Sequence, residues 1–336
     1  MNRILVVNVN WLGDAIMTTP AFKAIKEKFP LSSVAVMAPD RVKDVFSDNP
    51  YIDEVIIFNE KKEHKSFSQK LRFIKQLREK KFDTVFLIHR SFTRALICFL
   101  AGIKTRIGYK RFKNIFIVNK TIKPPAKNIH KQDYYLYLFE KTGIATADKL
   151  PEVYVPQQIQ EKYKTEITHL RQKHTYLVGM NPSANWLLKR WPQENFAILS
   201  DKLIRELNCC ILFVGAKIDA DVVGAVTNRM KEKPYNFCAK TSIKELAAII
   251  RNVDLFISND SGPAHLSASL GVNTLVLFGP TSPELSAPRG KRVQILKKSI
   301  RCEIPCYDTG CQNNLCMKNI TVEDTYQKAK ELLKNV

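Results

Sequence analysis

The chain has 336 residues, of which 45% are hydrophobic and 25% are charged, and its formal net charge is +21. This length allows two domains that each bury a core, and the composition is that of a globular protein. No apolar run reaches the ~18 residues of a membrane-spanning helix. The first residues, MNRILVVNVN, enter a strand pattern without the charged and apolar regions of a signal peptide, so we expect a cytoplasmic protein.

The positive charge is concentrated in the first half of the chain. Residues 1–150 contain 28 Lys and Arg against 14 Asp and Glu, and the interval 84–132 holds eleven cations and no acid. This asymmetry favours a polyanionic partner, which can be nucleic acid, an anionic membrane surface or a phosphorylated substrate. A general enrichment in Lys along the chain is the alternative explanation.

Short apolar runs alternate with amphipathic stretches in the first half, as in repeated β-α units on a parallel sheet. The runs predict strands at 4–9, 33–38, 54–58, 84–89, 105–109 and 115–119. The amphipathic stretches predict helices at 15–28, 41–47, 67–80, 91–100 and 130–142. The segment 148–156 is bounded by Pro and reads as an extended linker.

The second half repeats this scheme. Its apolar runs predict strands at 175–181, 209–215, 236–240, 254–259, 273–279 and 292–296. Helices are predicted at 157–172, 193–206, 219–231, 242–251, 263–270 and 321–334. The whole pattern predicts an α/β protein of two Rossmann-like, doubly wound domains, 1–150 and 151–336. We expect them to face across a cleft that holds a ligand at the carboxyl ends of the strands.

The stretch NWLGDAIMTTP (10–20) follows the first strand and allows two interpretations of Asp14. A carboxylate near a helix N-terminus is favoured by the helix dipole, so Asp14 can be only a cap. It can equally be a base held at the carboxyl edge of a parallel sheet, where open α/β folds bind their ligands. The local sequence leaves both interpretations open.

The strongest local signal is NDSGPAHLSASLG (259–271), where a buried strand ends and a helix opens with a proline. Asp260 or Ser261 can cap this helix, and Gly262 permits close approach of a ligand. The backbone amides of the first turn form an anion site, and His265 in the same turn can reach a phosphate. An ordinary capped helix with a buried histidine is the structural alternative.

Two further loops follow predicted strands of the second domain. In NPSANWLLKRWP (181–192), a polar loop leads to Lys189 and the arginine after it, and two cations there suit a pyrophosphate. A solvated basic loop is the alternative. In VGAKIDAD (214–221), Asp219 or Asp221 can bind ribose hydroxyls or cap the following helix.

Phosphate and ribose contacts on these loops would together make a nucleotide site. The dinucleotide fingerprint G-x-G-x-x-G is absent after the first strand of either half, and the P-loop sequence G-x-x-x-x-G-K-[ST] is absent as well. The sequence therefore disfavours both a nicotinamide enzyme and a P-loop NTPase.

The eight cysteines fall into two groups. Four lie in or beside apolar runs and are expected to be buried, inert thiols. The other four form a C-x3-C-x4-C-x4-C cluster, whose spacing does not match the usual C-x2-C pairs of zinc sites. We assign that cluster no role; its members are Cys302, Cys306, Cys311 and Cys316.

Four ordered motifs resemble the inverting bacterial heptosyltransferases of glycosyltransferase family nine. They are NWLGDAIMTTPAFKAIK, NPSAN with LKRWP, DSGPAH, and FGPTSP (278–283). The similarity runs from Arg3 to the C-terminal helix and is greatest to the heptosyltransferase II-like branch. It implies a GT-B type fold with an N-terminal domain that binds the lipid-linked acceptor. The C-terminal domain would bind ADP-heptose, and its last helix can pack back on the first domain.

The resemblance also assigns residues to roles. The family's essential acid falls on Asp14 and its phosphate-binding lysine on Lys189. Asp219 stands where many relatives carry Glu for ribose binding, and Ser183 stands where many carry Gly in an N-P-G turn. The expected donor-binding residues are Ser183, Lys189, Asp219, Asp260, Ser261, Gly262 and His265.

The reaction implied is transfer of heptose from ADP-heptose to the inner core of lipopolysaccharide with inversion, the second heptose onto the first. Asp14 would take the proton of the attacking hydroxyl, while Lys189, the first helical amides and His265 would meet the charge on the departing ADP. The family is metal-independent, so neither a metal nor another cofactor is expected. The alternatives are an acceptor of the heptosyltransferase I or III type, another nucleotide sugar, or a basic nucleic-acid-binding protein.

The basic first half would then serve the phosphates and carboxylates of the lipid A–Kdo acceptor. We expect peripheral binding to the anionic inner face of the inner membrane. The sequence does not indicate an oligomeric state. The candidate acceptor contacts, each of which can also be a plain solvated cation, are Lys61, Lys62, Arg94, Arg106, Lys110 and Arg111.

Overall fold

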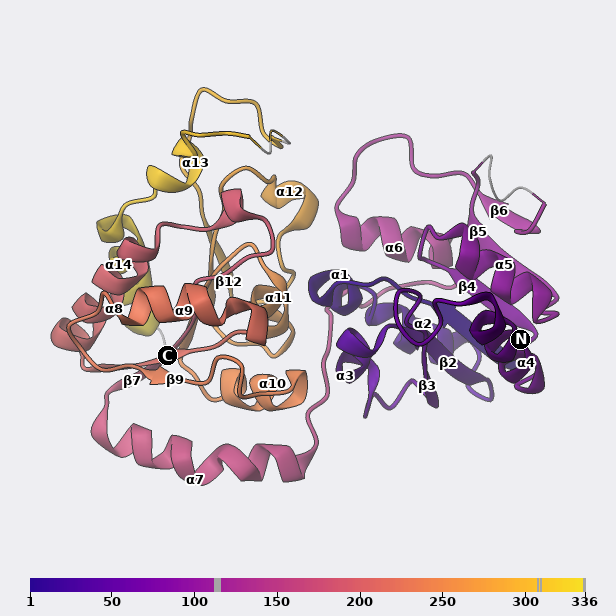
Figure 1. The fold of residues 1–336 in the computed structure, drawn as a ribbon, viewed down its shortest axis with the longest axis horizontal. Coiled ribbons are helices and arrows are strands. Elements are labelled where there is room, and N and C mark those ends of the chain that lie inside the picture. The colour runs from indigo at the N-terminus through magenta and orange to yellow at the C-terminus, as the bar shows by residue number, and fades with distance from the viewer. Residues whose placement is uncertain (112–115, 307, 309, 335–336) are drawn as a thin grey trace. The chain divides into compact units, whose positions relative to one another are not determined.

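The computed structural model describes residues 1–111, 116–306, 308 and 310–334. The chain divides into two compact units, Met1–Tyr154 and Val155–Val336, whose elements are labelled in Figure 1. The first unit therefore extends past the predicted boundary at 150. The reason is a contact of the extended segment with the first unit, since Glu152 N donates to Thr19 Oγ1 at 3.0 Å.

The first unit alternates strands and helices along its length. Its elements are β1 (Arg3–Val7), α1 (Leu12–Met17), α2 (Pro20–Lys28), β2 (Ser33–Ala38), η1 (Asp40–Val42), α3 (Lys43–Phe46), β3 (Glu54–Ile57), α4 (Phe67–Glu79), β4 (Thr84–Leu87), α5 (Phe92–Leu100), β5 (Thr105–Tyr109), β6 (Lys120–Ile122) and α6 (Lys131–Glu140).

The second unit repeats the alternation. Its elements are α7 (Gln157–Lys173), β7 (Tyr176–Asn181), η3 (Leu187–Lys189), α8 (Gln193–Leu207), β8 (Cys209–Phe213), η4 (Lys217–Asp219), α9 (Ala220–Thr227), β9 (Tyr235–Asn236), α10 (Ile243–Arg251), β10 (Leu255–Asn259), α11 (Gly262–Ser269), β11 (Thr274–Leu277), α12 (Pro283–Ser286), β12 (Val293–Leu296), α13 (Leu315–Lys318) and α14 (Val322–Lys334). Among the described residues, no helix is long and apolar enough to cross a membrane.

Both units contain a six-stranded parallel sheet with the same winding. The strand orders are β3-β2-β1-β4-β5-β6 and β12-β11-β10-β7-β8-β9. In each sheet the strand order reverses between the first strand of the unit and its fourth, at β1/β4 and at β7/β10. The connections that leave these neighbouring strands pass to opposite faces of the sheet, and open α/β sheets bind their ligands at the carboxyl ends of the strands at such a point. The predicted fold class, two doubly wound Rossmann-like units, is confirmed.

The central strands are buried on both faces, as continuous apolar runs in a parallel sheet predict. Residues Ile4 to Val7 of β1 are all 0% exposed. The helices α4 and α5 cover one face of the first sheet through a shared apolar cluster, while α6 packs with α1 and α2. In the second unit, α8 and α14 share an apolar cluster with β7, β8 and β10.

Several predicted elements differ from the structure: the helix predicted at 41–47 is η1 followed by α3, and the helix predicted at 219–231 ends at Thr227. Three further differences follow. The helix predicted at 15–28 is two helices, because Pro20 begins α2 and cannot donate a backbone hydrogen bond. In place of the strand predicted at 115–119, β6 begins at Lys120. Residue 115 lies outside the described residues, and the buried Ile117 and Val118 lie in a turn and in the irregular chain after it. The strand predicted at 236–240 ends early, since Ala239 has a left-handed backbone with φ of 63°.

The C-terminal helix α14 belongs to the second unit. The Lys202 ammonium of α8 lies 2.5 Å from a carboxylate oxygen of Glu323 in α14. Trp191 is 1% exposed, and its Nε1 donates to Ile320 O at 2.7 Å, just before α14. Trp191 of the LKRWP motif therefore packs in the core, and this structural role is enough to explain a large aromatic residue at that position.

Three side chains hold the loop between β1 and α1 by converging on Asn10. Arg94 of α5 donates to Asn10 Oδ1 at 2.7 Å and to Asn8 O at 2.8 Å. Arg41 Nε donates to Asn10 O at 2.8 Å, and Asn10 Nδ2 lies 2.8 Å from His89 Nε2. Arg94 is only 3% exposed, so its guanidinium is an internal brace for the loop that leads to α1.

Burial of this network favours the neutral form of its histidine. Burial, and then the positive charge of Arg94, lower the pKa of His89 to about 4. Burial also lowers the pKa of Arg94 to about 10. The loop is therefore built around a neutral imidazole beside a buried guanidinium, and protonation of His89 opposes that arrangement.

The first prediction concerns Gly279, which precedes Thr281 in the FGPTSP loop. A Cβ there would lie 2.3 Å from Sδ of Met317, which is 0% exposed. We expect Gly279→Ala to lower the free energy of unfolding by about 1–3 kcal/mol. Gly224→Ala in α9 is the matched control, because a Cβ there meets nothing within 4 Å; it should be neutral or stabilising by up to about 1 kcal/mol. Urea denaturation measures both, and equal effects would contradict the steric account.

The second prediction concerns pH. The folded pKa of His89 is about 4 and the ordinary value is 6.5. Between these two pKa values His89 is protonated in the unfolded chain but neutral in the folded one. The stabilisation that comes from neutral His89 is therefore complete above about pH 6.5 and is lost as the pH falls. We expect wild type to lose about 2 kcal/mol more than His89→Gln between about pH 7 and about pH 5. Urea unfolding curves at both pH values, followed by circular dichroism, test this; identical pH dependence in the two proteins would refute it.

Candidate functional site

The two loops that follow β7 and β10 are tied to each other at the reversal point of the second sheet. Asn259 Nδ2 donates to Pro182 O at 2.9 Å, and Trp191 N donates to Asn259 Oδ1 at 3.0 Å. Ser261 Oγ lies 3.4 Å from Asn181 Oδ1. The motifs NPSAN and NDSGP, which are distant in sequence, are therefore joined by hydrogen bonds.

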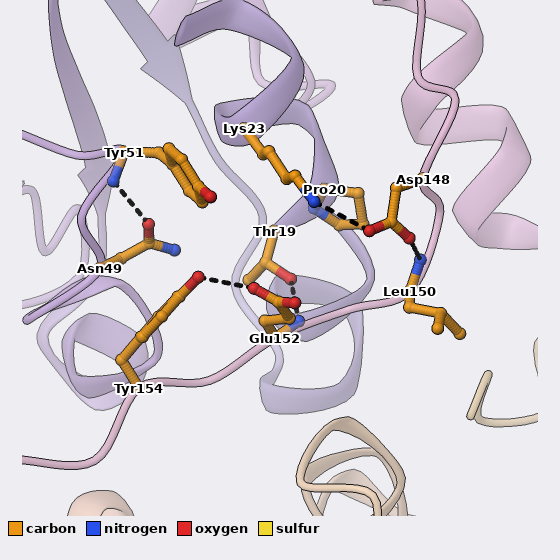
Figure 2. Close-up of a pocket in the computed structure, with 9 residues that line it drawn as sticks. All are labelled: Thr19, Pro20, Lys23, Asn49, Tyr51, Asp148, Leu150, Glu152 and Tyr154. Atoms are coloured by element: carbon orange, nitrogen blue, oxygen red, sulfur yellow. Dashed lines mark hydrogen bonds and ion pairs between the residues drawn. The ribbon is translucent and has the colours of Figure 1, made fainter. Parts of the chain in front are cut away.

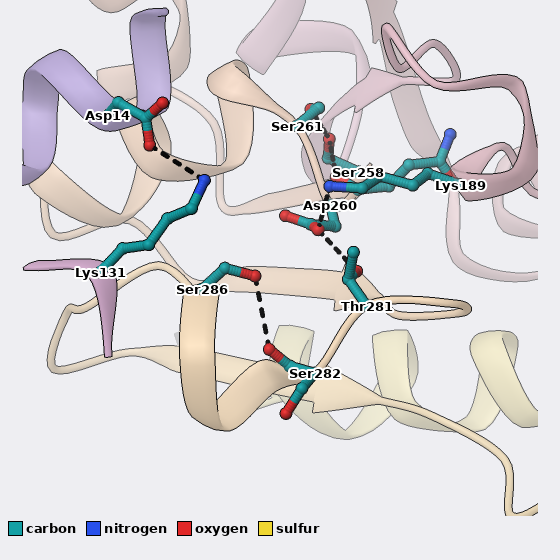
Figure 3. A network of polar contacts seen from close by, with 10 residues as sticks. Asp14, Lys131, Lys189, Ser258, Asp260, Ser261, Thr281, Ser282 and Ser286 are labelled. Atoms are coloured by element: carbon teal, nitrogen blue, oxygen red, sulfur yellow. Dashed lines mark hydrogen bonds and ion pairs between the residues drawn. The ribbon is translucent and has the colours of Figure 1, made fainter. Parts of the chain in front are cut away.

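A buried ion pair links the same two loops (Figure 3). Lys189 Nζ, at the end of η3, donates to Asp260 Oδ2 at 2.6 Å, and Thr281 Oγ1 donates to the same oxygen at 2.7 Å. The side chain of Asp260 is 5% exposed and that of Lys189 is 22% exposed. A buried carboxylate requires such partners because desolvation of an unpaired charge is costly. Lys189 keeps two further N–H donors for a ligand.

The first turn of α11 starts directly after this ion pair. Ser261 is the N-cap residue by position, but its side chain makes no cap bond to the helix. Its hydroxyl lies instead 2.9 Å from Ser258 Oγ. Gly262 opens the helix, and His265 in the first turn is 6% exposed. Amides in the first turn of a helix have no intrahelical acceptor, so they can bind an anion.

Ser183 lies on the same loop system and is 1% exposed. Its Oγ is buried and has no hydrogen-bond partner among the described residues. A buried hydroxyl without a partner costs free energy, which a polar ligand can recover. The predicted donor residues that the structure brings together here are Ser183, Lys189, Asp260, Ser261, Gly262 and His265.

Asp219 lies on the neighbouring loop, after β8, and has a local structural role. Its Oδ2 accepts a hydrogen bond from Ala216 N at 2.8 Å. Gly215 is needed there, because a Cβ would lie 2.9 Å from the Cβ of Asp219. Asp221 is exposed in the first turn of α9. Asp219 therefore holds the turn that starts η4, but as the N-cap residue of α9 its side chain makes no cap bond to that helix. A ribose role for Asp219 remains a proposal.

In the first unit, Asp14 lies in the first turn of α1 but makes no cap bond there. Its side chain is 15% exposed and faces α6, where Lys131 Nζ is 3.4 Å from Asp14 Oδ1 (Figure 3). Burial, and then the negative charge of Asp14, raise the pKa of the Tyr135 phenol. Asp14 is thus a half-enclosed carboxylate between a cation and a phenol.

The candidate acceptor cations separate into two classes. Lys61, Lys62 and Lys110 are exposed, and Arg111 is exposed with one N–H bond to Arg90 O at 2.9 Å. The other two, Arg94 and Arg106, are used inside the fold.

Arg94 is the buried brace of the Asn10 loop, so the expectation that it contacts an acceptor directly is not supported. The guanidinium of Arg106 donates to Ile117 O at 2.5 Å and to Ile103 O, and it lies 5.0 Å from the ring centroid of Phe99. It therefore holds the β5–β6 connection.

A small pocket of the first unit contains none of the predicted site residues (Figure 2). Its polar groups are paired with one another: Lys23 Nζ lies 2.9 Å from Asp148, and Tyr154 donates to Glu152 at 2.6 Å. These contacts fasten the extended chain after α6 to α2. The pocket is lined by Thr19, Pro20, Lys23, Asn49, Tyr51, Asp148, Leu150, Glu152 and Tyr154.

Three members of the cysteine cluster precede α13, and Cys316 lies within that helix. Cys302 is exposed, Cys306 and Cys311 are half-buried, and Cys316 is buried. Burial raises the pKa of the Cys316 thiol. Within the part of the chain that the structure describes, no group of three His, Cys, Asp or Glu side chains is arranged to hold a metal ion.

The partners of the two carboxylates, Asp14 and Asp260, were not predicted from the sequence. Thr281 lies in the FGPTSP motif, which was noted only as a resemblance, and its hydroxyl binds Asp260. Lys131 and Tyr135 are four residues apart on α6 and so share one helix face. That spacing was the only available signal, and nothing in it indicated Asp14 as the target.

Comparisons with known proteins agree with this geometry. The chain is 25% identical to lipopolysaccharide heptosyltransferase 2 of Escherichia coli K12 over 88% of each protein. It is 28% identical to lipooligosaccharide heptosyltransferase 2 of Campylobacter jejuni serotype O:2 over 99% of each. A crystal structure of a family 9 glycosyltransferase from Veillonella parvula superposes with a TM-score of 0.90 at 26% identity, covering 100% of this chain and 98% of the other.

The family description "Glycosyltransferase family 9 (heptosyltransferase)" matches residues 70–316, which is most of the chain. That interval includes the loops after β7 and β10, the ion pair between them and the first turn of α11. The protein belongs to glycosyltransferase family 9.

Proposed function

We propose that this protein is an inverting glycosyltransferase that moves heptose from ADP-heptose to the inner core of lipopolysaccharide, the second heptose onto the first. Support comes from relatives named heptosyltransferase 2, which align with 88% and 99% of the chain. One observation carries the proposal. Lys189, paired with Asp260, lies beside the uncapped start of α11, at the point where the strand order of the second sheet reverses.

The donor diphosphate is assigned to this second-unit site. One N–H of Lys189 contacts Asp260, and its other N–H groups can bind a phosphate. The N-terminus of α11, which is the positive end of the helix dipole, starts directly after Asp260. Ser183 supplies a buried hydroxyl that lacks a partner among the described residues. Asp219 accepts from Ala216 N through Oδ2, which leaves Oδ1 for a ribose hydroxyl.

Asp14 is assigned as the general base. The acceptor hydroxyl gives its proton to the carboxylate while its oxygen forms a bond to the anomeric carbon. The bond from that carbon to the diphosphate oxygen breaks, and its electron pair leaves with ADP. Attack from the side opposite the leaving group inverts the anomeric configuration. Lys131, 3.4 Å from Asp14, keeps the side chain in place before the proton is transferred.

The charge on the departing ADP is assigned to Lys189, to the first amides of α11 and to His265. We propose that these groups act without a divalent ion. The only D-x-D sequence, Asp219-Ala220-Asp221, has its first carboxylate engaged with the Ala216 amide, which suits a rigid ribose contact better than a metal ligand.

The exposed cations of the first unit are assigned to the acceptor. Lipid A and Kdo carry phosphates and carboxylates, and Lys61, Lys62, Lys110 and Arg111 are available to meet them. We further propose a cytoplasmic enzyme that binds peripherally to the inner face of the inner membrane, where the acceptor is anchored. The net charge of +21 supports attraction to that anionic surface.

The third prediction tests the base. Asp14→Asn removes the proton acceptor but keeps the size of the side chain, so we expect kcat to fall by about 10²–10⁴-fold. ADP affinity should remain within about twofold, because the donor is assigned to the other unit. Coupled ADP-release kinetics and calorimetry measure the two quantities.

The matched control is Asp44→Asn, which changes an acid in the first turn of α3 in the same unit. It should leave kcat unchanged. Near-normal turnover by Asp14→Asn would remove Asp14 from the mechanism.

The fourth prediction tests the phosphate site. Lys189→Ala removes the cation and leaves Asp260 buried without its ion-pair partner, so both donor affinity and kcat should fall, each by about 10–100-fold. Lys173→Ala, an exposed cation at the C-terminal end of α7, is the control. Titration with ADP and steady-state kinetics give the two numbers, and unchanged ADP affinity would contradict the assignment.

A further inference from the structure

Exposed aromatic side chains stand at the carboxyl edge of the first sheet. Phe67 is the first residue of α4 and Phe92 the first residue of α5, with exposed fractions of 77% and 46%. Each helix is the next element after a strand, α4 after β3 through residues 58–66 and α5 after β4 through residues 88–91. Both helix starts therefore lie on the side of the sheet where the parallel strands end. Leu71, four residues after Phe67 and therefore on the same helix face, is 48% exposed.

These aromatic positions are fixed by the local structure. A capping box defines the start of α4, where Gln69 N donates to Ser66 Oγ and Ser66 N donates to Gln69 Oε1. Arg94 N donates to Ser91 Oγ at the start of α5. These caps fix the first turns of α4 and α5, so the exposed positions of Phe67 and Phe92 follow from ordered local structure.

The preceding loop, 59–66, is equally well supported. The His64 ring lies 4.9 Å from the ring centroid of Phe58 and 4.7 Å from that of Phe73. His64 Nδ1 also accepts from Asn59 N at 3.2 Å. This anchor leaves Lys61 and Lys62, together with Lys65, on the exposed side of the loop.

Two contacts bring these parts to the start of α5 from both sides. The guanidinium carbon of Arg94 lies 5.7 Å from the ring centroid of Phe58, which precedes the loop. On the other side, Arg111 donates to Arg90 O, two residues before Phe92. The start of α5 therefore has Arg90 and Arg111 next to it, and Phe58 leads from the same place into the loop that carries Lys61 and Lys62. We call this surface the rim: Lys61, Lys62, Lys65, Phe67, Arg90, Phe92, Lys110 and Arg111.

We propose that the rim docks the protein on an anionic lipid bilayer, with Phe67 and Phe92 entering the interfacial layer and the cations contacting headgroup phosphates. The charge of the rim complements such a surface despite Glu60 and Glu63 in the same loop. A soluble polyanion satisfies the cations only, whereas a bilayer also buries the two phenyl rings. The proposal deepens the proposed function, on which it rests for its choice of a lipid-borne acceptor.

The test measures co-sedimentation of the full chain with vesicles of phosphatidylethanolamine and phosphatidylglycerol, without donor or acceptor. Phe67→Ser and Phe92→Ser should each weaken partitioning by about tenfold, since each removes a buried aromatic side chain. Lys61→Ala with Lys62→Ala should weaken it as well, and binding should fall between about 0.05 M and about 0.5 M NaCl. Vesicles of neutral phosphatidylcholine should bind weakly.

Phe99→Ser is the matched control. Phe99 lies at the other end of α5 and is 44% exposed, close to the value for Phe92. It should bind vesicles like wild type, and thermal unfolding confirms that each variant is folded. Wild-type partitioning by both Phe67→Ser and Phe92→Ser overturns the proposal, as does an equal loss in Phe99→Ser. Because no sugar is present, failed heptose transfer refutes the proposed function without affecting this result.

Discussion

The structure depends on one constraint, the reversal of strand order in the middle of a fully buried parallel sheet. Apolar residues fill both faces of the central strands, so polar groups can gather only where those strands end. In the second sheet the loops after β7 and β10 meet there, and a carboxylate that is 5% exposed must be paired. Lys189 and Thr281 provide that pairing. The same contacts that stabilise the loops also leave a cation and uncapped helix amides at one place.

The first sheet has an equivalent reversal point, between β1 and β4, and there the polar groups brace a loop. The loop after β1 is braced by Arg94, His89 and Arg41, which converge on Asn10. This brace fixes the start of α1, and Asp14 then faces Lys131 on α6. Asp14 makes no cap bond, so its carboxylate is not occupied by the helix that carries it. A rigid loop, a carboxylate with little exposure and exposed cations nearby suit the base that we propose for a charged, lipid-borne acceptor.

Much of this arrangement could be predicted from the sequence. Continuous apolar runs alternating with amphipathic stretches predicted both sheets, and polar motifs after strands predicted where Lys189, Asp260 and Asp14 lie. Tertiary pairing could not be predicted: Lys189 and Asp260 are 71 positions apart. Arg94 looked like a surface cation because residue type does not reveal burial. The apolar pair Ile117 and Val118 indicated a strand, but both are buried outside the sheet, because a side chain can be buried without its backbone pairing with a strand.

The central claim is that the reversal point of the second sheet binds the diphosphate of the donor. A crystal structure of the protein soaked with ADP tests it most directly. The account predicts phosphate oxygens within hydrogen-bond distance of Lys189 Nζ and of the amide of Gly262, with ribose near Asp219. ADP bound elsewhere, for example in the pocket between α2 and the extended segment 148–154, with Lys189 still bonded only to Asp260, would contradict it.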